Sequence, residues 1–133
     1  MSQVLLDTHV WVWSFNAKER LSPEATAILT VATSVTISAI TLYEIGQKVR
    51  LGKWPEMASS VATLASMARE QGVEILDVTP EISLSAGVLS WGHRDPFDRI
   101  IGATARAHGL PLLSADIAFD GLAPMSGWAG RVW

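Results

Sequence analysis

Two carboxylates, Asp95 and Asp98, stand three residues apart in segment 93–105, at the start of a predicted helix. Pro96 fits the first helical position, where no backbone N–H is needed, so Asp95 takes the N-cap and Asp98 the third helical position. This is also the layout of a capping box with an acid at each end. The segment alone therefore allows two interpretations, helix capping or chemistry carried by a pair of acids.

Three further acids follow apolar segments far away in the chain. Asp7 ends the run 4–6, Glu44 lies in the helix after run 35–38, and Asp116 follows run 112–114. Each has a structural alternative: a helix cap for Asp7, a capping box with Thr41 or an ion pair with Lys48 for Glu44, and a turn for Asp116. Because sites in open α/β sheets lie beyond the carboxyl ends of the strands, we expect these acids and Asp98 at one edge.

Clustered carboxylates of this kind favour a bound divalent cation. They repel one another and raise one another's pKa unless a cation neutralises them, and their oxygen atoms suit Mg²⁺ or Mn²⁺. Such ions can activate water and stabilise charge during in-line attack on a phosphodiester. Arg99 beside the acids is expected to contact a phosphate, although a solvated helix surface would also explain it.

Composition excludes several other classes of protein. The chain has no cysteine and no zinc-type histidine spacing, no Gly-x-Ser-x-Gly motif and no phosphate-binding glycine loop. Its net charge of −3 argues against a wholly basic nucleic-acid binder, and no apolar run approaches the length of a membrane span. We therefore expect a cytoplasmic protein, with several of its six tryptophans exposed at a partner surface.

Predicted strands alternate with predicted helices along the whole chain. The strands are 4–6, 35–38, 73–78, 112–114 and an edge strand at 131–133; the helices are 9–15, 23–32, 40–51, 55–71, 80–90 and 96–108. This alternation is typical of an α/β fold with a parallel sheet of four to five strands and helices on both faces. Residues 1–133 are expected to form a single domain.

The chain resembles PIN-domain ribonucleases, and in particular the VapC toxins of type II toxin–antitoxin systems. The resemblance rests on residues 5–9, 38–45, 93–105 and 112–116, in that order and spacing. It implies a three-layer PIN fold and an endoribonuclease that depends on Mg²⁺ or Mn²⁺.

The resemblance also assigns site residues. It matches the family's first three acids to Asp7, Glu44 and Asp98, and the variable fourth to Asp116, with Asp120 as the alternative. Its accessory residues match Asp95, Thr8 and Ser114, with Arg99 beside them.

The implied partners are RNA, an antitoxin and a second copy of the chain. An antitoxin would place an apolar helix near Trp11, Trp13 and the helix that carries Glu44. Two other hypotheses come from different classes of protein. One is a non-catalytic acidic module that binds a basic protein. The other is a metal-dependent phosphatase with an aspartyl nucleophile. Such enzymes commonly carry Asp-x-Asp after the first strand, and Asp7-Thr8-His9 departs from that pattern.

Overall fold

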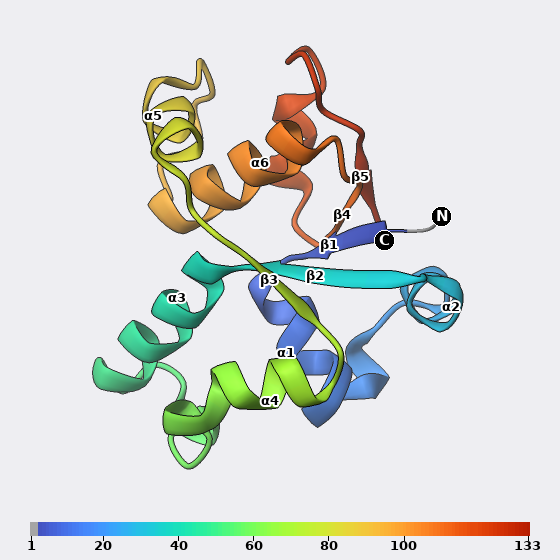
Figure 1. Ribbon diagram of the computed structural model, residues 1–133, viewed down its shortest axis with the longest axis vertical. Coiled ribbons are helices and arrows are strands. Elements are labelled where there is room, and N and C mark those ends of the chain that lie inside the picture. Colours follow the sequence, from blue (N-terminus) through green and yellow to red (C-terminus); the bar gives the residue numbers. More distant parts are fainter. Residues whose placement is uncertain (1–2) are drawn as a thin grey trace.

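A five-stranded parallel sheet forms the centre of the protein (Figure 1). The computed structural model describes residues 3–133. Its strands are β1 (Gln3–Leu6), β2 (Ser34–Ser38), β3 (Glu74–Leu76), β4 (Leu112–Leu113) and β5 (Arg131–Val132). They lie in the order β3-β2-β1-β4-β5, and every pair is parallel. The predicted fold class is confirmed, including the edge strand at the carboxyl end.

Helices cover both faces of the sheet, as predicted. The helices are α1 (Thr8–Asn16), α2 (Pro23–Val31), α3 (Ala39–Arg50), α4 (Leu64–Glu70), α5 (Pro80–Val88) and α6 (Pro96–His108). Four short 3₁₀ segments join them, η1 (Lys18–Arg20), η2 (Pro55–Met57), η3 (Val61–Thr63) and η4 (Ile117–Leu122). Figure 1 shows α5 and α6 on one face and α1, α3 and α4 on the other, which makes three layers.

The alternation of side chains along β1 builds one core on each face. Val4 and Leu6 pack with α1, α2, α3 and α4, whereas Leu5 packs with α5, α6 and η4. All three side chains are at most 1% exposed. A strand that is buried on both faces needs a continuous apolar run, which is the pattern of residues 4–6.

The predicted helix 55–71 is correct only in its second half, because the structure divides the segment into η2, η3 and α4. Amide groups here bond three residues back, as from Met57 to Trp54 and from Thr63 to Ser60. The hydroxyl of Thr63 also bonds to the carbonyl of Ser60, so a side chain competes for a helical acceptor. Trp54 and Met57 are buried as anchors of this segment, which fixes its path over the core. The next strand is shorter than predicted, spanning Glu74–Leu76.

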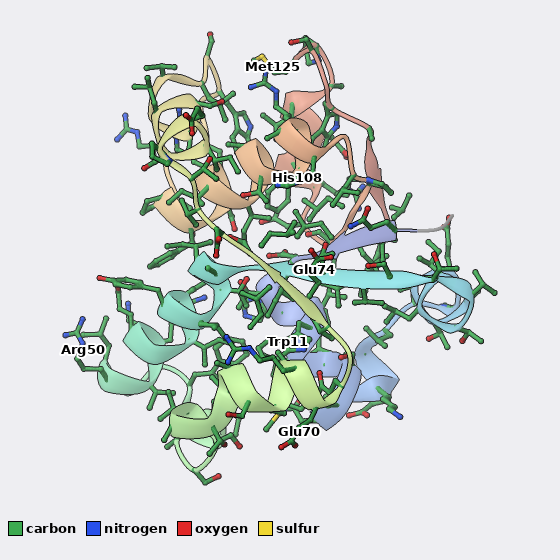
Figure 2. The ribbon with its side chains drawn as sticks, in the orientation of Figure 1. Trp11, Arg50, Glu70, Glu74, His108 and Met125 are labelled. Carbon is green, nitrogen blue, oxygen red and sulfur yellow. The ribbon has the colours of Figure 1, made fainter. Side chains whose placement is uncertain are left out.

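The expectation that several tryptophans are exposed is correct only in part. Trp11 is fully buried and Trp54 is 8% exposed, and the other four are partly buried. Figure 2 shows Trp11 beneath the sheet, among the helices of that face. The large apolar side chains that are exposed are aliphatic ones and Tyr43. No helix within residues 3–133 is both long and apolar enough to cross a membrane.

The sheet order places the end of β1 at a change of direction in the topology. From β1 the chain builds outward to β2 and β3 on one side, and it later adds β4 and β5 on the other side. Crevices for ligands form at such points, outside the carboxyl ends of the strands. The residues that follow β1 and β4 are therefore the first candidates for a functional site.

Candidate active site

An acidic cavity of about 390 Å³ lies at the carboxyl ends of β1 and β4. Five carboxylates and one ammonium group line it, from Asp7, Glu44, Asp95, Asp98, Asp116 and Lys48. These residues come from segments far apart in the chain, and the sheet brings them together as the sequence predicts. We refer to this space as the acidic cavity.

Asp7 is fixed between β1 and β4. Its backbone N–H donates to the carbonyl of Leu113 at 3.0 Å, and its Oδ1 accepts the N–H of Thr8 at 2.7 Å. The Ser114 hydroxyl donates to Oδ2 at 2.7 Å. The capping interpretation of Asp7 is thus correct, but the cap uses only one oxygen. The other oxygen is oriented by a residue 107 positions away in sequence.

Glu44 lies within α3 and is only 3% exposed. Its Oε2 accepts from Lys48 Nζ at 2.6 Å, and its Oε1 accepts from the Thr8 hydroxyl, also at 2.6 Å. The Thr41 hydroxyl lies 2.9 Å from that of Thr8 and extends the chain of hydrogen bonds. The predicted pair with Lys48 is confirmed. The predicted capping box is wrong, because Ser38 caps α3 and the helix begins before Thr41.

Asp95 and Asp98 have different partners. Asp95 is the N-cap of α6, and its Oδ1 accepts from the backbone N–H groups of Phe97 at 2.8 Å and Asp98 at 3.2 Å. Asp98 does not complete a capping box. Its Oδ2 lies 2.7 Å from His93 Nε2 instead. Helix capping therefore accounts for the position of Asp95, whereas the carboxylate of Asp98 takes no part in capping.

His93 is the site residue that the sequence interpretation missed. Its ring packs against that of Trp91 at a centroid distance of 5.0 Å. Ligand atoms of His93, Asp98 and Asp116 lie within 4.8 Å of one another, close enough to hold a metal ion. Asp7 lines the same cavity without joining this group of three. The only signal in the sequence was the position of His93 two residues before a capping aspartate.

Asp116 and Asp120, the two candidates for the fourth acid, lie in different surroundings. Asp116 follows β4, accepts the N–H of Ala118 at 2.9 Å, and lines the acidic cavity. The Ser114 hydroxyl accepts the Asp116 N–H at 3.0 Å, which links this loop to Asp7. Asp120 instead pairs with Arg131 at 2.9 Å, which lowers the pKa of Asp120. The geometry thus favours Asp116.

Arg99 does not face a phosphate site, and that expectation is corrected. Its guanidinium donates to main-chain carbonyl groups at the end of α5 and in the loop before α6. The acceptors are Leu89 at 2.7 Å, Trp91 at 2.8 Å, His93 at 2.9 Å, Ala86 at 3.0 Å and Gly87 at 3.5 Å. Because its donors are used in this way, Arg99 holds the loop that presents His93 to Asp98.

Burial and mutual repulsion make the acidic cavity unfavourable for negative charge. Burial, together with the nearby Asp98 and Glu44, raises the pKa of Asp7 to about 7, although the hydrogen bonds from Ser114 and Thr8 oppose this shift. Burial also raises the pKa of Asp98 to about 6, although the bond to His93 opposes this. Such perturbed carboxylates in a cavity are typical of functional sites.

A divalent cation fits this donor set. The cavity offers carboxylate oxygens from several elements, with Lys48 as its one ammonium group, and the imidazole of His93 lies beside Asp98 and Asp116. Hard divalent ions take such oxygen ligands, and their charge would offset the repulsion that raises both pKa values. The arrangement can therefore hold a cation and, with it, a phosphate group.

Comparison with known proteins gives one consistent result. The PIN domain family matches residues 4–123. Ribonuclease VapC22 of Mycobacterium tuberculosis (strain ATCC 25618 / H37Rv) is 32% identical over 120 residues, which are 87% of this chain and 88% of that protein.

Solved toxin–antitoxin structures share the fold. VapBC-5 from Mycobacterium tuberculosis has a TM-score of 0.68 and 23% identity, covering 99% of this chain and 100% of that chain. VapBC2 from Rickettsia felis, bound to a DNA fragment from its promoter, has a TM-score of 0.66 and 19% identity, covering 98% of both chains.

Proposed function

Because this chain belongs to the PIN-domain family, in its VapC group of ribonuclease toxins, we propose that it hydrolyses RNA phosphodiester bonds at the acidic cavity with Mg²⁺ or Mn²⁺. The observation that carries the proposal is the convergence of Asp7, Glu44, Asp98 and Asp116 on one cavity. Nucleases of this family use a divalent metal, and four acids from separate elements suit one.

Asp7, Asp98 and Asp116 would hold the cation, with Glu44 beside them. When bound, the ion would supply activation of water and neutralisation of charge on the phosphate. The Ser114 hydroxyl orients Asp7 through its 2.7 Å bond. His93 orients Asp98 in the same way. These bonds hold the carboxylates in place before substrate arrives, which lowers the cost of arranging them during the reaction.

The reaction is a hydrolysis, and its atoms balance simply. A water oxygen forms a bond to phosphorus, one phosphorus–oxygen bond to a ribose breaks, and the leaving oxygen takes a proton. The attacking water gives up a proton as its bond to phosphorus forms. Lys48, paired with Glu44, adds a positive charge at the wall where the phosphate would lie.

We infer that an antitoxin is the protein partner. The supporting feature is an apolar groove of about 750 Å³ on the α1 face, which includes Trp11, Phe15, Leu21 and Leu29. Unlike the surface expected from the resemblance, this groove includes neither Trp13 nor a residue of α3. An apolar segment of the antitoxin would bury these side chains, in the manner of a helix in a groove. Trp11 itself is covered, so it would form the floor of the groove rather than an anchor that projects from it.

A homodimer and a cytoplasmic location complete the proposal. Leu84 and Val88 on α5 are 69% and 73% exposed, and a second copy of the chain would cover such aliphatic surface. A cytoplasmic location would bring the protein together with the proposed substrate, cellular RNA. Light scattering should give twice the mass of one chain at micromolar concentration, and a monomer would contradict the dimer.

The test of the function is cleavage of a structured RNA by the purified protein. We expect cleavage with Mg²⁺ or Mn²⁺, none after chelation, and none with Asp98→Asn. Expression should also arrest growth, and coexpression of the antitoxin should relieve the arrest. A protein that binds the antitoxin but cuts no RNA under any of these metal conditions would instead be the non-catalytic acidic module.

A further inference from the structure

A second cavity, of about 520 Å³, adjoins the acidic cavity along α1. The two share His9, Trp13 and Lys48, so they meet at the first two turns of this helix. Asp7 caps the same helix. A polymer whose phosphate lies at the acids would therefore extend along α1 into the second cavity. We call this second space the aromatic cavity.

The rings of His9 and Trp13 form the surface of the aromatic cavity that is nearest to the acids. His9 stacks on Trp54 at 4.8 Å with an interplanar angle of 25°. Trp54 is only 8% exposed, so it holds the imidazole, while His9 itself is exposed. Trp13 lies beside His9 at 5.8 Å and is tilted by 53°. An aromatic surface that is already rigid is what stacking of a nucleic-acid base requires.

The excess of negative charge in the acidic cavity does not extend into the aromatic cavity. Five carboxylates and one lysine line the acidic cavity. Apart from Lys48, which pairs with Glu44, the aromatic cavity carries two cationic side chains, Arg20 and Lys53, and two glutamates. Within residues 3–133, neither Arg20 nor Lys53 forms an ion pair. Arg20 lies over the ring of Trp13, 5.7 Å from its centroid. Cations beside aromatic rings form the usual surface for a single-stranded backbone.

The geometry points to a subsite for one unpaired RNA nucleotide in the aromatic cavity, next to the phosphate that is cut. The base would stack on His9, with the tilted ring of Trp13 at its edge, and its phosphate would lie near Lys53 and Arg20. The identity of the ligand as RNA rests on the proposed function. A duplex would not fit this scheme, because its bases are paired and stacked and present no free face.

Binding of a short fluorescent RNA by the Asp98→Asn protein tests the subsite without cleavage. Trp13→Leu and His9→Ala, each added to that background, should weaken binding of the single strand about 5- to 150-fold, the range for loss of one stacked base. Binding of a duplex of the same sequence should change less than about twofold, because its bases are not free to stack. Lys53→Gln should reduce the slope of log affinity against log salt by about 0.7, the value for one phosphate contact on a single strand.

Matched controls come from residues that line neither the acidic cavity nor the aromatic cavity. Trp128→Leu changes a partly buried tryptophan that packs in the other core, and Arg69→Gln changes an exposed cation on α4. Neither should alter RNA binding. If Trp13→Leu does not fold, as judged by circular dichroism, His9→Ala and Lys53→Gln carry the test, because both side chains are exposed.

Unchanged affinity in these variants, or no RNA binding by the Asp98→Asn protein itself, would overturn the subsite. The subsite is also refuted if Trp13→Leu keeps RNA affinity and instead weakens binding of the antitoxin, because the surface then serves a protein. Metal-dependent cleavage by the unmodified chain is measured separately. Cleavage that persists while the variants bind normally refutes the subsite alone, whereas absence of cleavage refutes the proposed function.

Discussion

Replacing Asp98 by asparagine separates the two roles that its position at the start of α6 allows. As a helix cap, the residue needs only an oxygen that accepts a hydrogen bond, which asparagine retains. As a metal ligand it needs the negative charge. In the structure Asp95 carries the capping bonds, and the Asp98 carboxylate points to His93. We therefore expect Asp98→Asn to fold normally and to lose RNA cleavage.

The stability of this variant should rise when no metal is present. The pKa of Asp98 is raised from 3.8 to about 6, mainly by burial. About two pKa units correspond to about 3 kcal/mol by which the ionised group disfavours the folded state. Asparagine removes this cost but also weakens the hydrogen bond to His93. We expect a net gain of about 1–3 kcal/mol in the free energy of unfolding at pH 8.

The pH dependence of that gain follows from the direction of the shift. Between about pH 4 and pH 6 the folded wild-type protein keeps the Asp98 proton that the unfolded chain has released. The unfolded state then binds fewer protons, so the free energy of unfolding of the wild type falls as pH rises through this window. Asparagine does not titrate. The advantage of Asp98→Asn should therefore be near zero at pH 4 and complete above about pH 7.

Urea unfolding, followed by tryptophan fluorescence at several pH values with and without metal, measures these effects. An ion at ten times its Kd stabilises the folded wild type by about 1.4 kcal/mol, and Asp98→Asn should lose most of that gain. NaCl of equal ionic strength should give neither protein this gain. Asp77→Asn, an exposed aspartate outside the cavity, serves as the control and should behave as wild type.

Two results would refute this reasoning. One is full metal-dependent cleavage by Asp98→Asn. The other is a loss of stability at pH 8 without metal, of the roughly 0.3–1 kcal/mol expected when a charge near a helix N-terminus is removed. Either result would mean that Asp98 supports the helix and that the site is wrongly assigned.

Three further predictions concern the same cavity. Asp7→Asn should also abolish cleavage, and it should raise the free energy of unfolding without metal at pH 8, because the pKa of Asp7 is raised to about 7. When Asp7→Asn is combined with Asp98→Asn, single-turnover cleavage should show little further loss of activity. Asp116→Asn should lower the cleavage rate and the metal-linked rise in Tm, whereas Asp120→Asn should change neither; the reverse order would make Asp120 the fourth acid. Arg99→Lys should lower the free energy of unfolding by about 2–3 kcal/mol, because lysine cannot replace a guanidinium that bonds several carbonyl groups, and an unchanged urea midpoint would contradict this role.

The sequence determined the elements of the fold because its local signals agree with one another. The buried run 4–6 specifies a strand that is covered on both faces, and β1 has this position. Asp95, Pro96 and Gly109 mark the ends of α6, where Asp95 caps the helix and Gly109 adopts a left-handed φ of 62°. Local signals were insufficient for segment 55–71, where buried anchors and serine and threonine side chains interrupt a helical composition.

The sequence also determined which acids meet, because strand ends in a parallel sheet share one edge. It could not determine the hydrogen-bond partners that these side chains find on other elements. The contacts of Asp98 with His93, of Ser114 with Asp7 and of Thr8 with Glu44 depend on how loops from different elements pack together. The same holds for Arg99, which lies next to the acids in sequence but donates to carbonyl groups at the end of α5.

Only the tertiary structure decided which surfaces adjoin the acidic cavity. His9 and Trp13 lie on one face of α1, a relation that the helical period predicts. Trp54, which supports the ring of His9, comes from a segment much later in the chain, and its arrival there depends on the path of the irregular segment around η2. Sequence patterns report periodicity within an element, whereas contacts between elements depend on the packing of the whole chain. The acids of the site could therefore be predicted from the sequence, but the residues that surround them could not.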